Sequence, residues 1–167
     1  QCTFPGRVVL LAEDNPVNRA VAEAMLAGFG LGVIAATNGA EAIEAVARHR
    51  CDLVLMDCQM PEVDGLEATR RIRLEERTAG ARPGNTGRHR RLPVIALTAN
   101  AMTGDRERCF AAGMDDYLTK PFTRAQLAAV LERWLAGTVA RSRKPAPRRN
   151  PMEDIAGETR GGGPIHA

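Results

Sequence analysis

The sequence predicts an α/β fold in which five β-strands alternate with five helices. Short, continuous apolar runs such as Val8–Ala12 and Leu53–Met56 are typical of strands buried on both faces of a parallel sheet. Segments with helical start and stop signals separate these runs. Because such alternation favours a parallel sheet covered by helices, we expect a single domain over residues 7–136.

The length of the chain is that of about one domain. It has 167 residues, of which 44% are apolar, and this is enough for a hydrophobic core. No apolar run approaches the roughly 18 residues that span a membrane, and Arg7 is followed by too few apolar residues for a signal peptide. We expect a cytoplasmic domain without membrane contact, whose parent protein can be anchored in the inner membrane. Since the chain begins at Gln1, residues 1–6 are expected to be a leader from an upstream linker.

The excess of basic charge lies at the C-terminal end. Residues 1–136 contain 17 basic and 17 acidic residues, whereas the tail 137–167 contains six basic and three acidic residues. The tail is rich in Pro and Gly and cannot bury a core, so it is expected to be a linker or disordered. We therefore do not expect direct binding to nucleic acid. The four cysteines show no paired spacing, which indicates a reduced protein with incidental thiols.

The first strand and helix have clear local signals. The run Val8–Ala12 is followed by Asn15 and Pro16, an N-cap residue and a proline suited to the first turn of a helix. This helix is expected to run to about Gly28, because glycine favours a helix end. The next apolar segment, Leu31–Ala36, is the second predicted strand.

The second helix and the third strand follow the same pattern. Asn38 can cap a helix that runs to about His49. The run Asp52–Asp57 is the third predicted strand, and a helix is expected from Gly65 to about Arg77. Gly65 is expected to permit a turn before this helix.

The last two strand–helix units complete the alternation. Pro93–Thr98 is the fourth predicted strand, and a short helix is expected over Gly104–Ala112 because Gly113 can stop it. Asp116–Thr119 is a short fifth strand, and Thr123 begins a capping box for the last helix. The apolar stripe of that helix consists of Leu127, Val130, Leu131, Trp134 and Leu135.

One segment, residues 78–92, does not fit this alternation. It contains three glycines, a proline and four arginines, with no apolar periodicity. A loop of this length in a compact domain is usually functional or disordered. We expect a mobile insertion, with a partner-docking loop as the alternative.

Polar side chains stand where the predicted strands end. Glu13 and Asp14 follow the first strand, and Asp57 ends the third. Thr98 ends the fourth strand, and Lys120 follows the fifth. The carboxyl ends of parallel strands form the ligand crevice of an open α/β sheet, so these groups should converge. Ionised carboxylates packed together need a cation, most simply Mg²⁺ with oxygen ligands. Lys120 is also one of only two lysines in a chain with 21 arginines.

These residues belong to four motifs, Leu11–Asn15, Met56–Gly65, Ala96–Ala99 and Tyr117–Phe122. Through these motifs the chain resembles the receiver domain of two-component signalling proteins, and it is most similar to receivers attached to hybrid sensor histidine kinases. The resemblance covers residues 7–136. It implies a flavodoxin-like (βα)5 fold, which is a doubly wound parallel sheet with strand order 2-1-3-4-5.

The resemblance implies a role for each residue of the crevice. Asp57 would be the nucleophile that accepts a phosphoryl group from a phosphohistidine and forms an acyl phosphate. Asp14 and Asp57 would bind Mg²⁺ directly, Glu13 through water, and Gln59 through its backbone carbonyl. Lys120 would pair with the phosphoryl oxygens as a compact cation.

The resemblance also implies a conformational switch. The hydroxyl of Thr98 would bond a phosphoryl oxygen and draw its loop inward. Tyr117 would then turn into the vacated space and change the face formed by the fourth helix, the fifth strand and the last helix. The plain alternative for Tyr117 is an ordinary half-buried strand aromatic. The Lys120–Pro121 peptide is expected to be cis.

Two other functions fit parts of the pattern. A Mg²⁺-dependent phosphatase with an aspartate nucleophile often carries a second acid two residues later, whereas this chain has Gln59 there. A flavodoxin-like cofactor-binding module would need a phosphate-cradling loop after the first strand, where Glu13 and Asp14 would repel phosphate. Both functions are therefore disfavoured.

The expected partner is a histidine kinase or a histidine phosphotransfer domain, and a weak dimer is a further expectation. A transcription factor would need a DNA-binding domain, for which the tail 137–167 is too short. A hybrid-kinase receiver and a single-domain relay protein are left as alternatives. The chain itself is expected to be a self-phosphorylating acceptor rather than a turnover enzyme.

Overall fold

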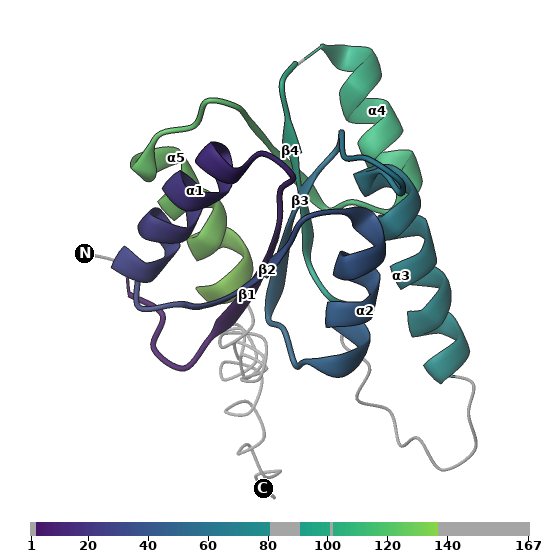
Figure 1. Cartoon of the computed structure of the whole chain (residues 1–167), viewed down its shortest axis with the longest axis horizontal. Helices are drawn as coiled ribbons and strands as arrows, with labels where there is room; N and C mark the ends of the chain where they lie inside the picture. The colour runs from purple at the N-terminus through teal and green to yellow at the C-terminus, as the bar shows by residue number, and fades with distance from the viewer. Residues whose placement is uncertain (1–2, 81–90, 101, 137–167) are drawn as a thin grey trace, which may run out of the picture.

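A computed structural model describes residues 3–80, 91–100 and 102–136 (Figure 1). Its centre is a sheet of five parallel strands in the order β2-β1-β3-β4-β5, which confirms the predicted α/β fold and strand order. The strands begin and end within one residue of the predicted runs. Their bounds are β1 Val8–Ala12, β2 Gly32–Ala36, β3 Leu53–Asp57, β4 Val94–Thr98 and β5 Asp116–Thr119.

Helices cover both faces of this sheet, two on one face and three on the other (Figure 1). The two are α1 Pro16–Gly28 and α5 Arg124–Leu131, and the three are α2 Gly39–Arg48, α3 Gly65–Gly80 and α4 Thr103–Ala112. The strands are buried on both faces because successive side chains point to opposite sides. Within β1, Val9 and Leu11 belong to one core, whereas Leu10 and Ala12 belong to the other. No helix among the described residues is long and apolar enough to cross a membrane.

The predicted capping residues occupy their expected positions. The side chain of Asn15 accepts a hydrogen bond from the backbone N–H of Val17 at 2.9 Å, at the start of α1. Thr123 and Gln126 form the reciprocal capping box of α5. Gly113 ends α4 with a φ of 106°, a left-handed conformation that glycine adopts without steric cost.

The third helix is longer than predicted. It ends at Gly80 rather than near Arg77, so residues 78–80, expected to begin the insertion, are helical. The hydroxyl of Thr78 donates to the Leu74 carbonyl, one turn earlier in the same helix, at 2.9 Å. The remaining predicted insertion and termini fall outside the described residues at 1–2, 81–90 and 137–167.

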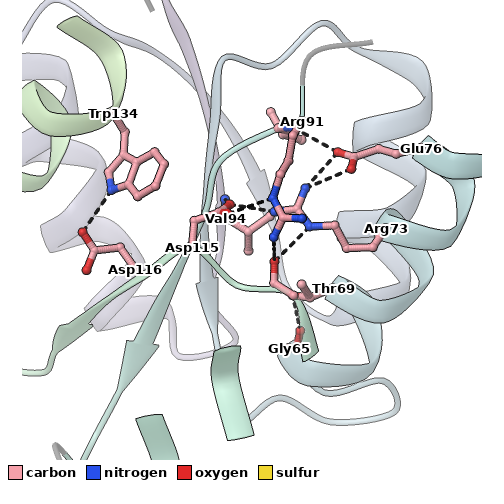
Figure 2. A network of polar contacts seen from close by, with 11 residues as sticks. Gly65, Thr69, Arg73, Glu76, Arg91, Val94, Asp115, Asp116 and Trp134 are labelled. Carbon is pink, nitrogen blue, oxygen red and sulfur yellow. Dashed lines mark hydrogen bonds and ion pairs between the residues drawn. The ribbon is translucent and has the colours of Figure 1, made fainter. Parts of the chain in front are cut away.

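The last helix differs from the single α-helix that its apolar stripe predicted. After α5 it widens into a π-helical turn over Glu132–Ala136. In this turn the indole Nε1 of Trp134 donates to Asp116 Oδ2 at 3.0 Å (Figure 2). Arg133 pairs with the same oxygen at 2.7 Å. The turn therefore ties the end of the described chain to β5.

A buried ion-pair network joins α3 to the turn between α4 and β5, as Figure 2 shows. The guanidinium of Arg73, which is 5% exposed, donates to Glu76 at 2.9 Å, to Asp115 at 2.7 Å and to the Gly113 carbonyl at 2.9 Å. Arg91 pairs with Asp115 as well, at 2.9 Å. Because Asp115 precedes β5, this network lies at the amino ends of the strands, opposite the predicted crevice.

Gly65 places the start of α3 directly against β3. A Cβ atom at this position would overlap the backbone carbonyl oxygen of Asp57. Its φ is not positive, so the turn expected before this helix does not use the conformational freedom of glycine. The glycine is needed for close approach instead, and it brings α3 alongside the residue that ends β3.

Candidate functional site

The carboxyl ends of β1, β3, β4 and β5 surround a cleft of about 450 Å³. The polar residues expected at this edge all line the cleft, namely Glu13, Asp14, Asp57, Gln59, Thr98 and Lys120. The parallel sheet brings them together from segments more than 100 residues apart, because every strand carries its last residue to the same edge. The predicted convergence is therefore confirmed. Tyr117 lies in β5 and does not line this cleft.

Two of the three acidic side chains are buried. Glu13 is 2% exposed and Asp57 is 4% exposed, whereas Asp14 is exposed to solvent. One carboxylate oxygen from each lies within 4.8 Å of the others, a spacing that suits a shared cation. An all-oxygen, acidic donor set of this kind fits a hard divalent ion.

Lys120 supplies the positive charge nearest to this cluster. Its Nζ lies 3.0 Å from Glu13 Oε2 and 3.1 Å from Asp57 Oδ2, so one ammonium group bridges two buried carboxylates. The backbone N–H of Lys120 donates to the Thr98 carbonyl at 2.8 Å, which fixes the strand end that carries it. The Lys120–Pro121 peptide is cis, as expected.

Burial and charge shift the pKa values of the bridged pair. Burial, followed by the nearby charge of Glu13, raises the pKa of Asp57 to about 6, although hydrogen bonds from Gln59 and Lys120 act in the opposite direction. Burial acts to lower the pKa of Lys120, but its hydrogen bonds to Glu13 and Asp57 outweigh this and raise it. At neutral pH the cleft therefore holds an ionised Asp57 at an energetic cost, next to a charged Lys120.

Because of this cost, the stability difference between the wild-type domain and an Asp57→Asn variant is expected to depend on pH. Because the pKa of Asp57 is higher in the folded state than its ordinary value of 3.8, the wild-type domain binds this proton more tightly when folded and gains stability as the pH falls from above 6 toward 4. Without divalent ions at pH 7, Asp57→Asn is expected to be more stable by about 2 kcal/mol. Denaturant unfolding of both proteins in chelator, from pH 4 to pH 7, measures the difference. A difference that does not change with pH would contradict the expectation.

Thr98 and Gln59 are engaged with their neighbours. The hydroxyl of Thr98 donates to the Asn100 carbonyl at 2.8 Å and accepts from the Asn100 N–H at 3.1 Å, so it closes a local turn at the rim of the cleft. The backbone N–H of Gln59 donates to Asp57 Oδ1 at 3.1 Å. This bond leaves Asp57 with one oxygen held by Gln59 and the other by Lys120.

Two contacts at this end of the molecule have no sequence signal. The guanidinium of Arg106 in α4 lies 4.4 Å from the ring centre of Tyr117, a cation–π contact that holds the half-buried tyrosine. The Sγ atoms of Cys58 and Cys109 lie 3.5 Å apart. Each pair joins residues that no motif or periodicity connects, because they meet only when α4 packs onto the sheet.

Sequence relatives place this chain among signalling proteins. The family description "Response regulator receiver domain" matches residues 9–132. The chain is 41% identical over 141 residues to the sensor protein GacS of Pseudomonas syringae pv. syringae, covering 84% of this chain and 14% of that protein. It is 39% identical over 147 residues to probable histidine kinase 1 of Oryza sativa subsp. indica, covering 76% and 15%. The chain thus spans about a seventh of the length of these relatives.

Solved structures agree with these relatives. The receiver domain of sensor histidine kinase PA1611 from Pseudomonas aeruginosa PAO1, which has a magnesium ion coordinated in its active site cleft, is 47% identical with a TM-score of 0.65, covering 78% of this chain and 98% of that one. The receiver domain of Ssk1 from Saccharomyces cerevisiae, solved with the histidine phosphotransfer protein Ypd1, is 31% identical with a TM-score of 0.75, covering 81% and 93%. With its sheet order, its acidic cleft and a family match over most of its length, this chain belongs to the response regulator receiver domains.

Proposed function

We propose that this domain accepts a phosphoryl group on Asp57 from a phosphohistidine donor, with Mg²⁺ bound beside it. The observation that carries the proposal is the position of Asp57, which ends β3 inside the cleft with Lys120 Nζ at 3.1 Å and two further carboxylates close by. Asp14 and Asp57 would hold the ion directly, Glu13 through water, and Gln59 through its carbonyl. The bound ion supplies charge neutralisation for the incoming phosphoryl group.

Asp57 and Lys120 have different roles in the phosphoryl transfer. A carboxylate oxygen of Asp57 attacks the phosphorus, the bond from phosphorus to the histidine nitrogen breaks, and the imidazole leaves with that electron pair. Since the pKa of Asp57 is about 6, this carboxylate is mostly ionised at neutral pH and can act as the nucleophile. Lys120 already contacts one oxygen of Asp57, so it is positioned to neutralise a phosphoryl group attached there.

The switch depends on contacts that a phosphoryl group would replace. Thr98 would exchange its bonds to Asn100 for a bond to a phosphoryl oxygen, which draws the loop after β4 toward Asp57. Tyr117 would then leave the guanidinium of Arg106 and turn inward. Both arrangements belong to one equilibrium, and phosphorylation shifts its populations.

The donor docks beside the mouth of the cleft in this proposal. On α1, Val17 is 69% exposed and Val21 is 51% exposed, and the exposed Ala20 and Ala24 extend this apolar surface. Val21 and Phe122 line a second hollow of about 520 Å³, which shares Glu13 and Lys120 with the acidic cleft. A helical histidine phosphotransfer or kinase dimerisation domain with apolar side chains around its histidine would cover this hollow and present the phosphoryl group to Asp57.

We further propose that the domain works in the cytoplasm as part of a hybrid sensor histidine kinase. The support is that the relatives described above are sensor and histidine kinases several times longer than this chain. A weak dimer and the absence of nucleic-acid binding stay predictions.

The experiment that tests the function uses a phosphohistidine-carrying donor protein with labelled phosphorus. The chain is expected to become labelled in the presence of Mg²⁺, to lose the label in hydroxylamine as an acyl phosphate does, and to stay unlabelled in chelator. Labelling that persists in chelator would contradict the role of the ion. Steady release of phosphate from small esters over many turnovers would instead support a phosphatase.

Lys120→Arg is expected to slow phosphoryl uptake by about tenfold although the charge is kept, because a planar guanidinium cannot copy one ammonium nitrogen placed between two carboxylates. The measurement is the initial rate of labelling at fixed Mg²⁺. Arg108→Lys is the matched control, since this exposed side chain also lines the cleft and should tolerate the exchange. Unchanged uptake and unchanged output in Lys120→Arg would refute the requirement for lysine.

A further inference from the structure

Two cysteines distant in the sequence meet beside the acidic cleft. The Sγ of Cys58, the residue after Asp57, lies 3.5 Å from the Sγ of Cys109 in α4, and both residues line the cleft. Both are free thiols, as is Cys51, the remaining cysteine within the described residues. The expectation of incidental thiols therefore overlooked a pair, because 51 positions separate its members.

The two sulfur atoms are in van der Waals contact. Cys58 is partly exposed and Cys109 is 3% exposed, so a small oxidant that enters the cleft meets Cys58 first. A disulfide has a sulfur–sulfur bond of about 2.05 Å, so the two atoms need to approach by about 1.5 Å. Burial, followed by the neighbouring Cys109 and Asp57, raises the pKa of the Cys58 thiol, so its reaction with peroxide is expected to be slow. The feature that favours oxidation is the second thiol, which lies within reach and can resolve an oxidised Cys58.

We propose that Cys58 and Cys109 form a peroxide-oxidisable pair whose disulfide slows phosphoryl acceptance at Asp57. In the first step hydrogen peroxide oxidises the Cys58 thiol to a sulfenic acid and is itself reduced to water. In the second step the Cys109 sulfur attacks the sulfenic sulfur, the sulfur–oxygen bond breaks, and a second water leaves as the disulfide forms. A dithiol reductant reverses the change by thiol–disulfide exchange.

The bridge would act on the phosphoacceptor through the backbone. The N–H of Cys58 donates to the Leu97 carbonyl at 3.0 Å, and its carbonyl accepts from the N–H of Gly65 at 3.3 Å. Because this residue is held on both sides, a pull on its side chain is transmitted to its neighbours Asp57 and Gln59. Displacement of reacting groups by about 1 Å can cost up to a hundredfold in rate, so at least about tenfold slower uptake is expected.

The test uses the chain with Cys2→Ser and Cys51→Ser, which leaves only the proposed pair. After treatment with hydrogen peroxide, non-reducing peptide mapping is expected to find the peptides of Cys58 and Cys109 linked. Labelling from acetyl phosphate with Mg²⁺ is expected to be at least about tenfold slower, and to recover in dithiothreitol. The same background with Cys109→Ser is the matched control, in which dithiothreitol-reversible slowing should be lost.

Two results would overturn the proposal. One is the absence of the linked peptide while circular dichroism shows a folded domain. The other is a linked domain that takes up phosphate as fast as the reduced one. The effect on rate rests on the proposed function, so Mg²⁺ affinity is measured in parallel by calorimetry. If the reduced domain accepts no phosphate at all, the proposed function fails. In that case equal Mg²⁺ affinities of the oxidised and reduced domains would show that the disulfide does not disturb the cleft, and the redox proposal would fail as well.

Discussion

Asp57→Asn is expected to reduce phosphoryl uptake from a phosphohistidine donor to background. The substitution removes the nucleophilic oxygen but preserves the shape of the side chain, and the single amide oxygen can still accept from one of the two donors, the N–H of Gln59 or the ammonium of Lys120. Loss of folding would not explain the result, because removal of a buried ionised carboxylate is expected to stabilise the domain at neutral pH. The measurement is hydroxylamine-sensitive label on the isolated domain.

Asp64→Asn is the matched control for this variant. Asp64 also lines the cleft, but its carboxylate accepts from the Glu67 N–H at 2.8 Å at the start of α3. Asparagine caps helices as well as aspartate does, so uptake should be close to that of the wild type. Hydroxylamine-sensitive label on Asp57→Asn, at the level of the wild type or of this control, would overturn the assignment of the phosphoacceptor.

Arg73→Ala is expected to lower the free energy of unfolding by about 1.5–3 kcal/mol, since the half-buried carboxylates of Glu76 and Asp115 lose a buried guanidinium while Asp115 keeps only Arg91 as a charged partner. Arg73 donates to Asp115 at 2.7 Å and to Glu76 at 2.9 Å (Figure 2). Both carboxylates also accept from backbone N–H groups at or just before the start of β4, Glu76 from Leu92 and Asp115 from Val94. Loss of one guanidinium therefore loosens α3, β4 and the turn before β5 together. Denaturant unfolding at pH 7 measures the change.

Arg71→Ala provides the comparison, because Arg71 is exposed on the same helix and pairs only with Glu67 among the described contacts, at 3.2 Å. A pair of this kind contributes about 0.3–0.5 kcal/mol. Equal losses in the two variants would show that the buried network of Arg73 adds nothing beyond a surface ion pair.

The order of strands and helices was predictable because each element carries local signals. The buried runs, the caps at Asn15 and Thr123 and the helix end at Gly113 all depend on residues within one or two turns. The ends of two helices were less predictable. The helix α3 extends to Gly80, and the stretch Glu132–Ala136 is π-helical. Local sequence signals do not show at which residue such a helix ends, and an apolar stripe does not distinguish an α-helical from a π-helical turn.

The acidic site was predictable for a different reason. A parallel sheet delivers every strand end to one edge, so the positions of Asp14, Asp57 and Lys120 at the ends of three predicted strands were enough to bring them together. The sequence could not tell that Lys120 bridges Glu13 and Asp57, nor that burial raises the pKa of Asp57. Those properties depend on distances and exposed fractions.

By itself the sequence determined the alternation of strands and helices and the membership of the acidic cleft, because local propensity and parallel topology suffice for both. Its four motifs determined the family resemblance, which in turn implied the strand order. Only the tertiary structure decided which groups touch across the layers: Arg73 with Asp115, Arg106 with Tyr117, and Cys58 with Cys109. In each case a helix must pack on the sheet before the two side chains meet. Contacts of this kind depend on the angle and depth of packing, which no spacing of residues along the chain records.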